Sequence, residues 1–293
     1  MMHAPPYVYR LLVMTILLVF AAFFFVPIIW LILAPTKTDS QLISHSPFAF
    51  GSFGNFGHSF HRVITYQGNL MLTWLKNSAI YSLAGTALAV AVAIPAGYGL
   101  ALTEFIGRRT LLAITLVVMI MPAAALVLPL FLEADAVHLV GTVWSVILPF
   151  AFFPFGVYLA YIYFSATIPR DLLAAARIDG ATEWGVFYHV ALRLAWPIVG
   201  LVGFFAFVAD WNNYYLPFVM TYDNSQYPVS IGLQILISSS PVFSPTAVGG
   251  AGTELYRPDL AAATIIAIVP VLIIFLFAQR TLVRGMLAGA TKE

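Results

Sequence analysis

The densest group of charged side chains lies between Ile168 and Pro197, in the sequence IPRDLLAAARIDGATEWGVFYHVALRLAWP. Long apolar runs flank this segment on both sides. Its first half carries two acidic and two basic side chains within one short helical pattern, namely Arg170, Asp171, Arg177 and Asp179. A charged amphipathic helix between two apolar runs is typical of a surface that meets a soluble partner. The chemistry that this segment offers is therefore recognition of another protein.

The first half of this segment predicts a helix with defined ends. Thr167 can cap its start, and Pro169 and Asp171 are residue types favoured in a first turn. Gly180 suits the end of the helix, where a positive φ is needed. A second short helix is expected to start at Thr182–Glu183 and to run into the next apolar run. The alternative interpretation is an interfacial helix that rests on lipid head groups.

A second group of polar side chains lies inside an apolar run. It comprises Asp210, Trp211, Asn212, Asn213, Tyr214 and Tyr215. A carboxylate inside a membrane costs at least about 2.5–3.5 kcal/mol unless it faces water or a partner. These residues either pack against neighbouring helices or line a solute route. Aromatic and amide side chains suit sugars, because ring faces stack on sugar CH groups and amides bond hydroxyls.

Patterns for bond-making chemistry are missing from the sequence. It has no GxxxxGK[ST] phosphate loop, no HExxH, no nucleophile elbow and no paired carboxylates. Cysteine is absent, which excludes disulfides and thiolate metal sites, and the six histidines lack metal-ligand spacing. We therefore expect neither catalysis nor metal binding by this chain, and if ATP drives it, another chain must bind the nucleotide.

Composition and the length of the apolar runs predict the helices that position these polar groups. The chain has 293 residues, of which 61% are hydrophobic and 9% charged, whereas a soluble domain has about 25% charged residues. Apolar runs of twenty or more residues can cross a hydrocarbon core of about 30 Å at 1.5 Å per helical residue. The fold class predicted is an all-α polytopic membrane protein. The formal net charge of +1 gives no indication of nucleic-acid binding.

We predict a single transmembrane domain over 1–293, with six membrane spans. The spans are expected at about 11–34, 74–103, 110–132, 141–165, 191–219 and 260–282. Loops of about 40 residues, 35–73 and 220–259, are expected on one side of the membrane. On the other side we expect the charged loop 166–190 and a tail at 283–293.

Lysine and arginine predict the orientation of these spans. Nine of the thirteen fall on one side: Arg10, Arg108, Arg109, Arg170, Arg177, Arg193, Arg280, Arg284 and Lys292. Positive residues concentrate in cytoplasmic segments, so the charged loop and both termini are expected in the cytoplasm. The two long loops are then expected to face outward.

The segment LLAAARIDGA resembles the EAA loop of binding-protein-dependent ABC transporter permeases. Four further stretches are similar to the carbohydrate-uptake class, in particular to the smaller of the two maltose-type permease subunits. They are NSAIYSLAGTALAVAVAIPAGYGLA, GRRTLLAITLVVMIMPAAALVLPLF, ADWNNYYLPFVM and QRTLVRGMLAGATKE. The resemblance covers nearly the whole chain and implies a type I importer fold with six spans and a cytoplasmic coupling helix.

The resemblance implies that the charged loop docks on a cytoplasmic ATPase subunit. The residues implied in this coupling are Arg170, Asp171, Ala175, Ala176, Arg177, Asp179, Gly180 and Ala181. The sequence departs from the family at two places: Ala174 replaces the glutamate of the motif, and Leu192-Arg193 replaces its closing Leu-Pro. Docking is then expected to rest mainly on shape and apolar burial. An exposed ion pair contributes only about 0–1 kcal/mol, so the loss of the pair that the family's glutamate would make need not prevent assembly with the ATPase.

The resemblance also implies the partners. They are a second homologous permease subunit, two ATPase subunits that bind ATP and magnesium, an extracytoplasmic solute-binding protein and a sugar-like solute. The C-terminal residues Arg284, Gly285 and Gly289 resemble the part of the family's tail that reaches the ATPase interface, although the arginine could also be a membrane anchor. No cofactor is expected on this chain itself.

Three alternative functions remain open from the sequence. A permease of the same family could carry a non-sugar solute such as a glycerol phosphate. An ion-coupled secondary transporter would need coupling-ion residues within the membrane, and Asp210 is the one candidate. A membrane-embedded enzyme would need clustered catalytic side chains at one depth, which the sequence does not show.

Overall fold

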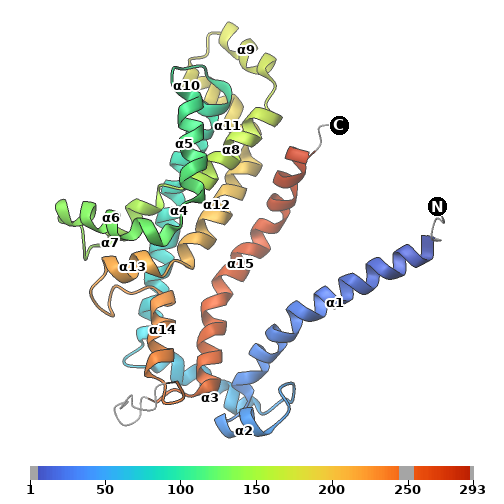
Figure 1. Cartoon of the computed structure of the whole chain (residues 1–293), viewed down its shortest axis with the longest axis vertical. Coiled ribbons are helices and arrows are strands. Elements are labelled where there is room, and N and C mark those ends of the chain that lie inside the picture. Colours follow the sequence, from blue (N-terminus) through green and yellow to red (C-terminus); the bar gives the residue numbers. More distant parts are fainter. Residues whose placement is uncertain (1–5, 244–253, 291–293) are drawn as a thin grey trace. The chain divides into compact units, whose positions relative to one another are not determined.

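Helices make up most of the computed structural model, and no strand occurs among the residues that it describes, 6–243 and 254–290 (Figure 1). The side chains of Pro6, Val8 and 280–290 other than Leu282 are also outside the described set. The first elements are α1 (Pro6–Leu33), η1 (Ala34–Thr36), α2 (Asp39–Ser44), α3 (Phe53–Thr65), α4 (Leu70–Leu102), α5 (Arg108–Ile120), α6 (Ala123–Ala136), α7 (Val143–Phe150) and α8 (Pro154–Thr167). They are followed by α9 (Arg170–Ile178), α10 (Glu183–Gly185), η2 (Val186–Ala191), α11 (Leu192–Leu194), α12 (Trp196–Trp211), α13 (Tyr215–Met220), α14 (Val229–Ser239) and α15 (Arg257–Ala290). This helical content confirms the predicted all-α fold class.

Four of the described helical segments are long and apolar enough to cross a membrane. They are Tyr9–Thr36, Leu70–Leu102, Val143–Thr167 and Arg257–Gln279. Two further pairs of helices have the required composition but are bent, so the number of candidate spans is six if each pair counts as one. The protein is therefore a multi-pass membrane protein.

The two bent pairs have a physical cause in the sequence. The axes of α5 and α6 differ by 108°, and those of Glu183–Leu194 and α12 differ by 79°. Pro122 is the residue before α6, and Pro197 lies in the first turn of α12. Proline has no backbone N–H to donate and its ring clashes with the preceding helical turn, so both helices break there.

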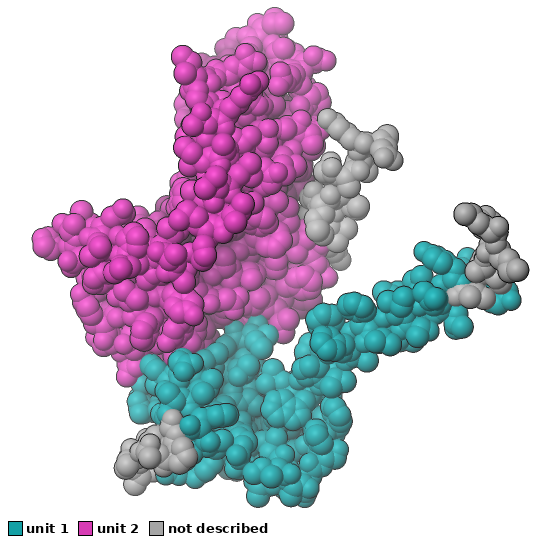
Figure 2. Space-filling model, viewed as in Figure 1, with its two compact units in different colours: residues 1–71, 233–268 teal, residues 72–232, 269–293 magenta. Residues whose placement is uncertain are grey.

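The chain forms two compact units (Figure 2). Unit 1 contains residues 1–71 and 233–268, and unit 2 contains residues 72–232 and 269–293. Both predicted outer loops contain helices that the sequence analysis did not foresee, α2 and α3 in the first and α14 in the second.

Two ion pairs fasten unit 1 around the start of α15. Arg62 Nη2 lies 2.7 Å from Asp259 Oδ1, and Arg257 Nη1 lies 2.8 Å from Asp39 Oδ2. Asp259 is completely buried, and its Oδ2 also accepts a hydrogen bond from the backbone N–H of Tyr256 at 2.9 Å. These four charged residues are called the α15 ion-pair cluster below. They tie α2 and α3 to the first turn of α15.

Unit 2 has a hydrophobic core that α4, α8, α9, η2 and α12 share. Its members are Ala93, Ile94, Tyr98, Ala101, Ala160, Tyr163, Phe164, Ile168, Leu173, Val186, Phe187, Ala191, Ala195, Ile198, Leu201, Val202 and Leu282. The ring of Tyr98 lies 5.6 Å from that of Phe164 and 5.0 Å from that of Phe187. The core therefore extends from the long helix α4 into the predicted cytoplasmic loop.

The backbones of α4 and α8 approach closely at Gly97. A Cβ atom added there would lie 2.4 Å from Cβ of Ala160 and 2.8 Å from the backbone N of Tyr161. Atoms cannot approach so closely, so a side chain at position 97 is incompatible with this packing. Small residues at helix crossings are typical of membrane bundles, where close backbone packing replaces the hydrophobic effect between helices.

Candidate functional site

The helix α9 lies in the predicted loop 166–190 and is exposed on most of its surface. Seven of its nine residues are exposed, Ala176 is half-buried, and Leu173 is 2% exposed. Leu173 belongs to the core of unit 2 together with Tyr98 and Phe187. The charged helix therefore packs on the bundle through Leu173, with Ala176 beside it, while its seven exposed residues are available to a partner.

The start of α9 differs from the prediction. Pro169 occupies the N-cap position and provides no side-chain hydrogen bond, while Thr167 ends the preceding helix α8. The hydroxyl of Thr167 is buried and has no hydrogen-bond partner among the described residues. The predicted cap by Thr167 is wrong, because the chain stays helical up to this residue and only then turns at Ile168.

The end of α9 is a Schellman turn. The backbone N–H of Gly180 donates to the carbonyl of Arg177, and that of Ala181 donates to the carbonyl of Ala176, both at 3.0 Å. Gly180 has a φ of +85°, a conformation that glycine adopts without strain. This confirms the predicted role of Gly180. The hydroxyl of Thr182 then caps α10 by accepting a hydrogen bond from the N–H of Gly185 at 3.2 Å, at the predicted start of the second helix.

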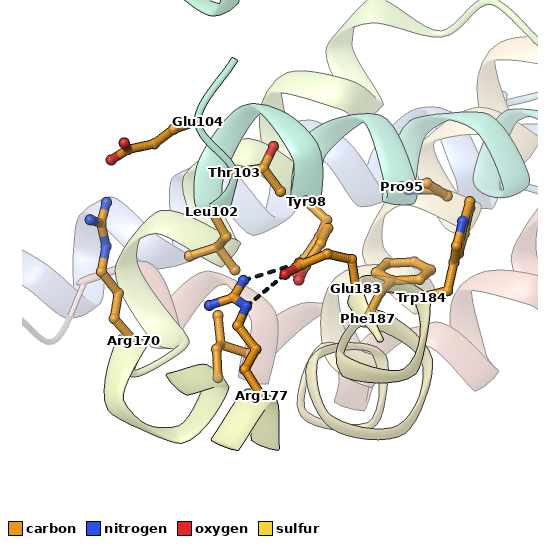
Figure 3. Close-up of a pocket in the computed structure, with 11 residues that line it drawn as sticks. Pro95, Tyr98, Leu102, Thr103, Glu104, Arg170, Arg177, Glu183, Trp184 and Phe187 are labelled. Atoms are coloured by element: carbon orange, nitrogen blue, oxygen red, sulfur yellow. Dashed lines mark hydrogen bonds and ion pairs between the residues drawn. The ribbon is translucent and has the colours of Figure 1, made fainter. Parts of the chain in front are cut away.

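An ion pair bridges this turn. Arg177 Nε lies 2.7 Å from Glu183 Oε1, and Arg177 Nη2 lies 3.1 Å from Glu183 Oε2, so the guanidinium holds both carboxylate oxygens (Figure 3). The side chains are 39% and 62% exposed, respectively. The hydrogen bonds from Arg177 lower the pKa of Glu183, which keeps this carboxylate ionised at neutral pH. We call Arg177 and Glu183 the loop ion pair.

A cavity of about 640 Å³ lies beside the loop ion pair. Its lining comes from the end of α4, from α9, and from α10 with η2 (Figure 3): Pro95, Tyr98, Leu102, Thr103, Glu104, Arg170, Leu173, Arg177, Glu183, Trp184 and Phe187. The hydroxyl of Tyr98 is buried and has no hydrogen-bond partner among the described residues. Trp184 is 74% exposed and makes an edge-to-face contact with the ring of Phe187.

The residues predicted for ATPase coupling lie together on α9 and its terminal turn. Their exposed members are Arg170, Asp171, Ala175, Arg177, Asp179, Gly180 and Ala181, while Ala176 is half-buried. Arg177 also makes a contact within the loop, since two of its three guanidinium nitrogens bond Glu183.

A second cavity, of about 480 Å³, lies in unit 2 where three breaks in helices meet. Its walls come from the bend between α5 and α6, the joint between α7 and α8, and the end of α12. Five of the six residues predicted for a solute route line it, namely Asp210, Asn212, Asn213, Tyr214 and Tyr215. Its volume is in the range of small-molecule sites, about 300–1,000 Å³.

The polar side chains at this cavity differ in what they bond. Asn212 donates through Nδ2 to the carbonyl of Val208 at 2.8 Å and is exposed. Asn213 accepts through Oδ1 from the N–H of Leu216 at 3.2 Å and so caps α13. Asn212 is therefore free to turn toward a solute at the cost of one local bond, whereas Asn213 also stabilises the chain's turn.

Asp210 and Trp211 point in different directions. Asp210 packs over α4 at Gly85, where an added Cβ would lie 2.8 Å from Oδ2. That oxygen is buried and has no hydrogen-bond partner among the described residues. Trp211 is buried and stacks on Phe207 at 5.5 Å, and it is not part of the cavity lining. The structure thus brings five of the six predicted residues together and places Trp211 in the packed interior.

The predicted tail residues Arg284, Gly285 and Gly289 fall within the last turns of α15. Their side chains lie outside the described residues, as does all of 291–293. Among the described residues there is no group of three or more His, Cys, Asp or Glu that could hold a metal ion.

Sequence reasoning missed two features of these sites. The loop ion pair could have been found from the opposite charges of Arg177 and Glu183 on either side of Gly180. The contribution of α5 and α6 to the second cavity, which includes Met119 and Met121, follows from the sharp bend at Pro122. The sequence shows that proline but not the 108° angle, so nothing in it indicates that these residues reach the cavity.

Comparison with known proteins covers most of the chain. Residues 93–288 match the family described as the binding-protein-dependent transport system inner membrane component. The arabinooligosaccharides transport system permease protein AraQ of Bacillus subtilis (strain 168) is 30% identical, over 99% of this chain and 99% of that protein. The trehalose transport system permease protein SugB of Mycobacterium tuberculosis is also 30% identical, over 91% and 92% of the two chains.

A solved structure has the same fold. It is the crystal structure of a bacterial ABC transporter involved in the import of the acidic polysaccharide alginate, and the chain superimposes on it with a TM-score of 0.80. The match covers 96% of this chain and 99% of that one at 22% sequence identity. At this level of identity the likeness establishes the fold alone.

Proposed function

The chain belongs to the family of binding-protein-dependent transport system inner membrane components, and from that premise we propose how its charged loop and its second cavity act in transport. It is a permease subunit of a sugar-importing ABC transporter, because its full-length relatives are permeases named for arabinooligosaccharides, lactose and trehalose. It is not an enzyme, since ATP hydrolysis in such systems belongs to partner subunits. The further assignments below are our proposals.

The charged loop is the segment that the ATPase contacts and displaces in order to change the conformation of the permease. The observation that carries this proposal is the combination of an exposed α9 with a single buried anchor, Leu173, in the core that contains α4 and α12. A force on α9 reaches the long helices through packed side chains of that core, because packed interiors transmit displacement instead of absorbing it. The residues in contact with the ATPase are the exposed ones from Arg170 to Ala181, apart from Arg177, whose guanidinium is held by Glu183.

The remaining assembly follows from the same proposal. A second homologous permease completes the translocation route, two ATPase subunits bind ATP and magnesium on the cytoplasmic side, and an extracytoplasmic binding protein delivers the solute. Both termini and the charged loop are cytoplasmic, as the distribution of lysine and arginine indicates. The membrane is the bacterial cytoplasmic membrane.

Two variants test the coupling role. Gly180→Pro removes the backbone N–H that donates to Arg177 and cannot adopt a φ of +85°, and Asp179→Lys reverses an exposed charge at the same turn. Both are expected to abolish transport and the stimulation of ATP hydrolysis by binding protein, while membrane insertion is retained. Asp135→Lys is the matched control, because Asp135 is an exposed aspartate on α6.

The readouts are uptake of labelled sugar into proteoliposomes and phosphate release by the purified complex. Normal uptake by either loop variant would remove the coupling assignment. Uptake by the purified chain alone, driven by an ion gradient without an ATPase, would refute the proposed assembly altogether.

The second cavity is this subunit's part of the solute route. The exposed amide of Asn212 and the rings of Tyr214 and Tyr215 offer hydrogen bonds and ring faces of the kind that sugars use. The breaks at α5–α6, α7–α8 and α12–α13 leave backbone that can reorient. Asn212→Leu is expected to impair uptake while basal ATP hydrolysis persists. Trp211→Phe is the control, since Trp211 is absent from the cavity lining. Equal uptake by Asn212→Leu and the unmodified protein would contradict this role.

A further inference from the structure

We propose that Arg177 and Glu183 are positioning residues for energy coupling. The proposal rests on the proposed function and deepens it. The loop ion pair braces the turn at Gly180, so that α9 and the helix that begins at Glu183 move as one body when the ATPase displaces the loop.

The two helices of the loop are packed into the core on one side and exposed at the turn that joins them. Leu173 and Phe187 hold the inner side of the loop in the core of unit 2. The far end of α9 leaves that core, because Ile178 is 86% exposed and all residues from Arg177 to Trp184 are exposed. At this end, α9 and α10 are linked by the backbone turn and by the loop ion pair.

The backbone turn alone is a weak link. Its central residue is Gly180, and an added Cβ there would meet no atom within 4 Å. No side chain therefore packs against Gly180 itself, and glycine has more backbone freedom than any other residue. A force applied to the end of α9 would bend the loop at this point unless another contact resists it.

The loop ion pair has the geometry to resist that bending. Two parallel hydrogen bonds between a planar guanidinium and a carboxylate fix both the distance and the relative orientation of the two groups. The pair spans Gly180 from the last turn of α9 to the first residue of α10. Because both side chains are largely exposed, the pair contributes little to overall stability. Its main effect is to fix the orientation of α9 relative to α10.

The pair also has a direct path into the membrane bundle. Tyr98 of α4 lines the same cavity as the pair (Figure 3). Its ring packs on Phe187, which lies in the helical segment Glu183–Leu194 that precedes α12. A rigid loop therefore passes its displacement to α4 and to the helix that precedes α12. A loop that yields at Gly180 loses part of that displacement.

The test compares sugar transported per ATP hydrolysed in the reconstituted complex. Glu183→Gln and Arg177→Gln are expected to lower this ratio about two- to fivefold, the range that one exposed ion pair can account for. The double variant Arg177→Glu with Glu183→Arg restores the pair with reversed charges and is expected to recover most of the ratio. Arg109→Gln is the control, since Arg109 is an exposed arginine outside the charged loop, is expected on the same side of the membrane, and makes no ion pair with the described residues.

Copurification of the ATPase subunits separates positioning from docking. The single variants are expected to retain the ATPase in the unmodified amount, with normal basal hydrolysis. Loss of the ATPase from these variants would overturn the proposal in favour of a direct docking role. An unchanged transport ratio, or a charge-reversed double variant no better than the single ones, would overturn it as well.

A covalent brace provides an independent check. The chain contains no cysteine, so Arg177→Cys with Glu183→Cys, in a complex with cysteine-free partners, can be joined by a short bifunctional thiol reagent. The ratio is expected to be low before the reagent is added and to recover after it. Failure to recover, with the crosslink verified by mass spectrometry, would contradict the proposal. If the unmodified complex needs no ATP for uptake, the proposed function itself fails, and this outcome is distinct from those above.

Discussion

The α15 ion-pair cluster of unit 1 and the loop ion pair of unit 2 use the same chemistry in different surroundings. In the cluster, Asp259 is fully buried and Arg62 is its cation, whereas in the loop both Arg177 and Glu183 are largely exposed. A buried carboxylate that loses its cation is left in a medium that solvates it poorly, while an exposed one is solvated by water. The comparison suggests that the cluster holds the fold together and that the loop pair sets an orientation.

The largest effect is expected from Arg62→Ala. It leaves Asp259 buried without a cation, with the N–H of Tyr256 and the hydroxyl of Ser59 as donors. The free energy of unfolding should fall by about 2–3 kcal/mol, somewhat less than for a fully buried pair because the Arg62 side chain is 47% exposed. Thermal unfolding of the purified complex in detergent measures this change. His61→Ala, at an exposed neighbouring position, is the control, and equal stability of the two variants would refute the structural role of the cluster.

A smaller effect is expected from Arg257→Ala. This arginine and Asp39 are 39% and 30% exposed, so solvent replaces part of the lost interaction. The expected loss is about 1 kcal/mol, at the upper end for accessible pairs. The same thermal measurement checks it, and a loss equal to that of Arg62→Ala would show that burial is not what separates the two pairs.

A still smaller change in stability is expected from Glu183→Gln. The substitution keeps the shape of the side chain and removes an exposed charge, so the unfolding temperature should stay within the error of the measurement. The comparison is sharpened if transport per ATP falls in the same sample. A clear drop in unfolding temperature would show that the loop ion pair stabilises the fold, as the α15 ion-pair cluster does.

The pH dependence of the loop pair should be negligible near neutrality. Arg177 lowers the pKa of Glu183 in the folded protein, so the contribution of the pair is present above the unfolded pKa of about 4.3 and is lost as the pH falls through the lower folded value. Transport per ATP should therefore be constant between about pH 6 and 8. A step in this range that Glu183→Gln lacks would show that the pair titrates near neutrality.

The second cavity shows how far local sequence can predict a site. The run from Asp210 to Tyr215 indicates polar groups in an apolar setting, and five of its six residues line one cavity. The sequence could not separate Trp211 from the others, because its burial depends on Phe207 one turn earlier and on where neighbouring helices cross. Another wall, formed by residues between Val118 and Leu130, is close to these residues because the chain bends by 108° at Pro122.

The amino-acid sequence by itself determined the membrane class, the charged loop, the helix end at Gly180 and the new start at Thr182. These features depend on composition and on contacts between residues a few positions apart, and both can be read from the sequence. Tertiary structure alone decided that Leu173 anchors the loop, that Tyr98 stands beside Arg177 and Glu183, and that Asp259 is buried against Arg62. These contacts join segments up to about 200 residues apart, and they follow from the angles at which helices bend and cross, which no short stretch of sequence specifies.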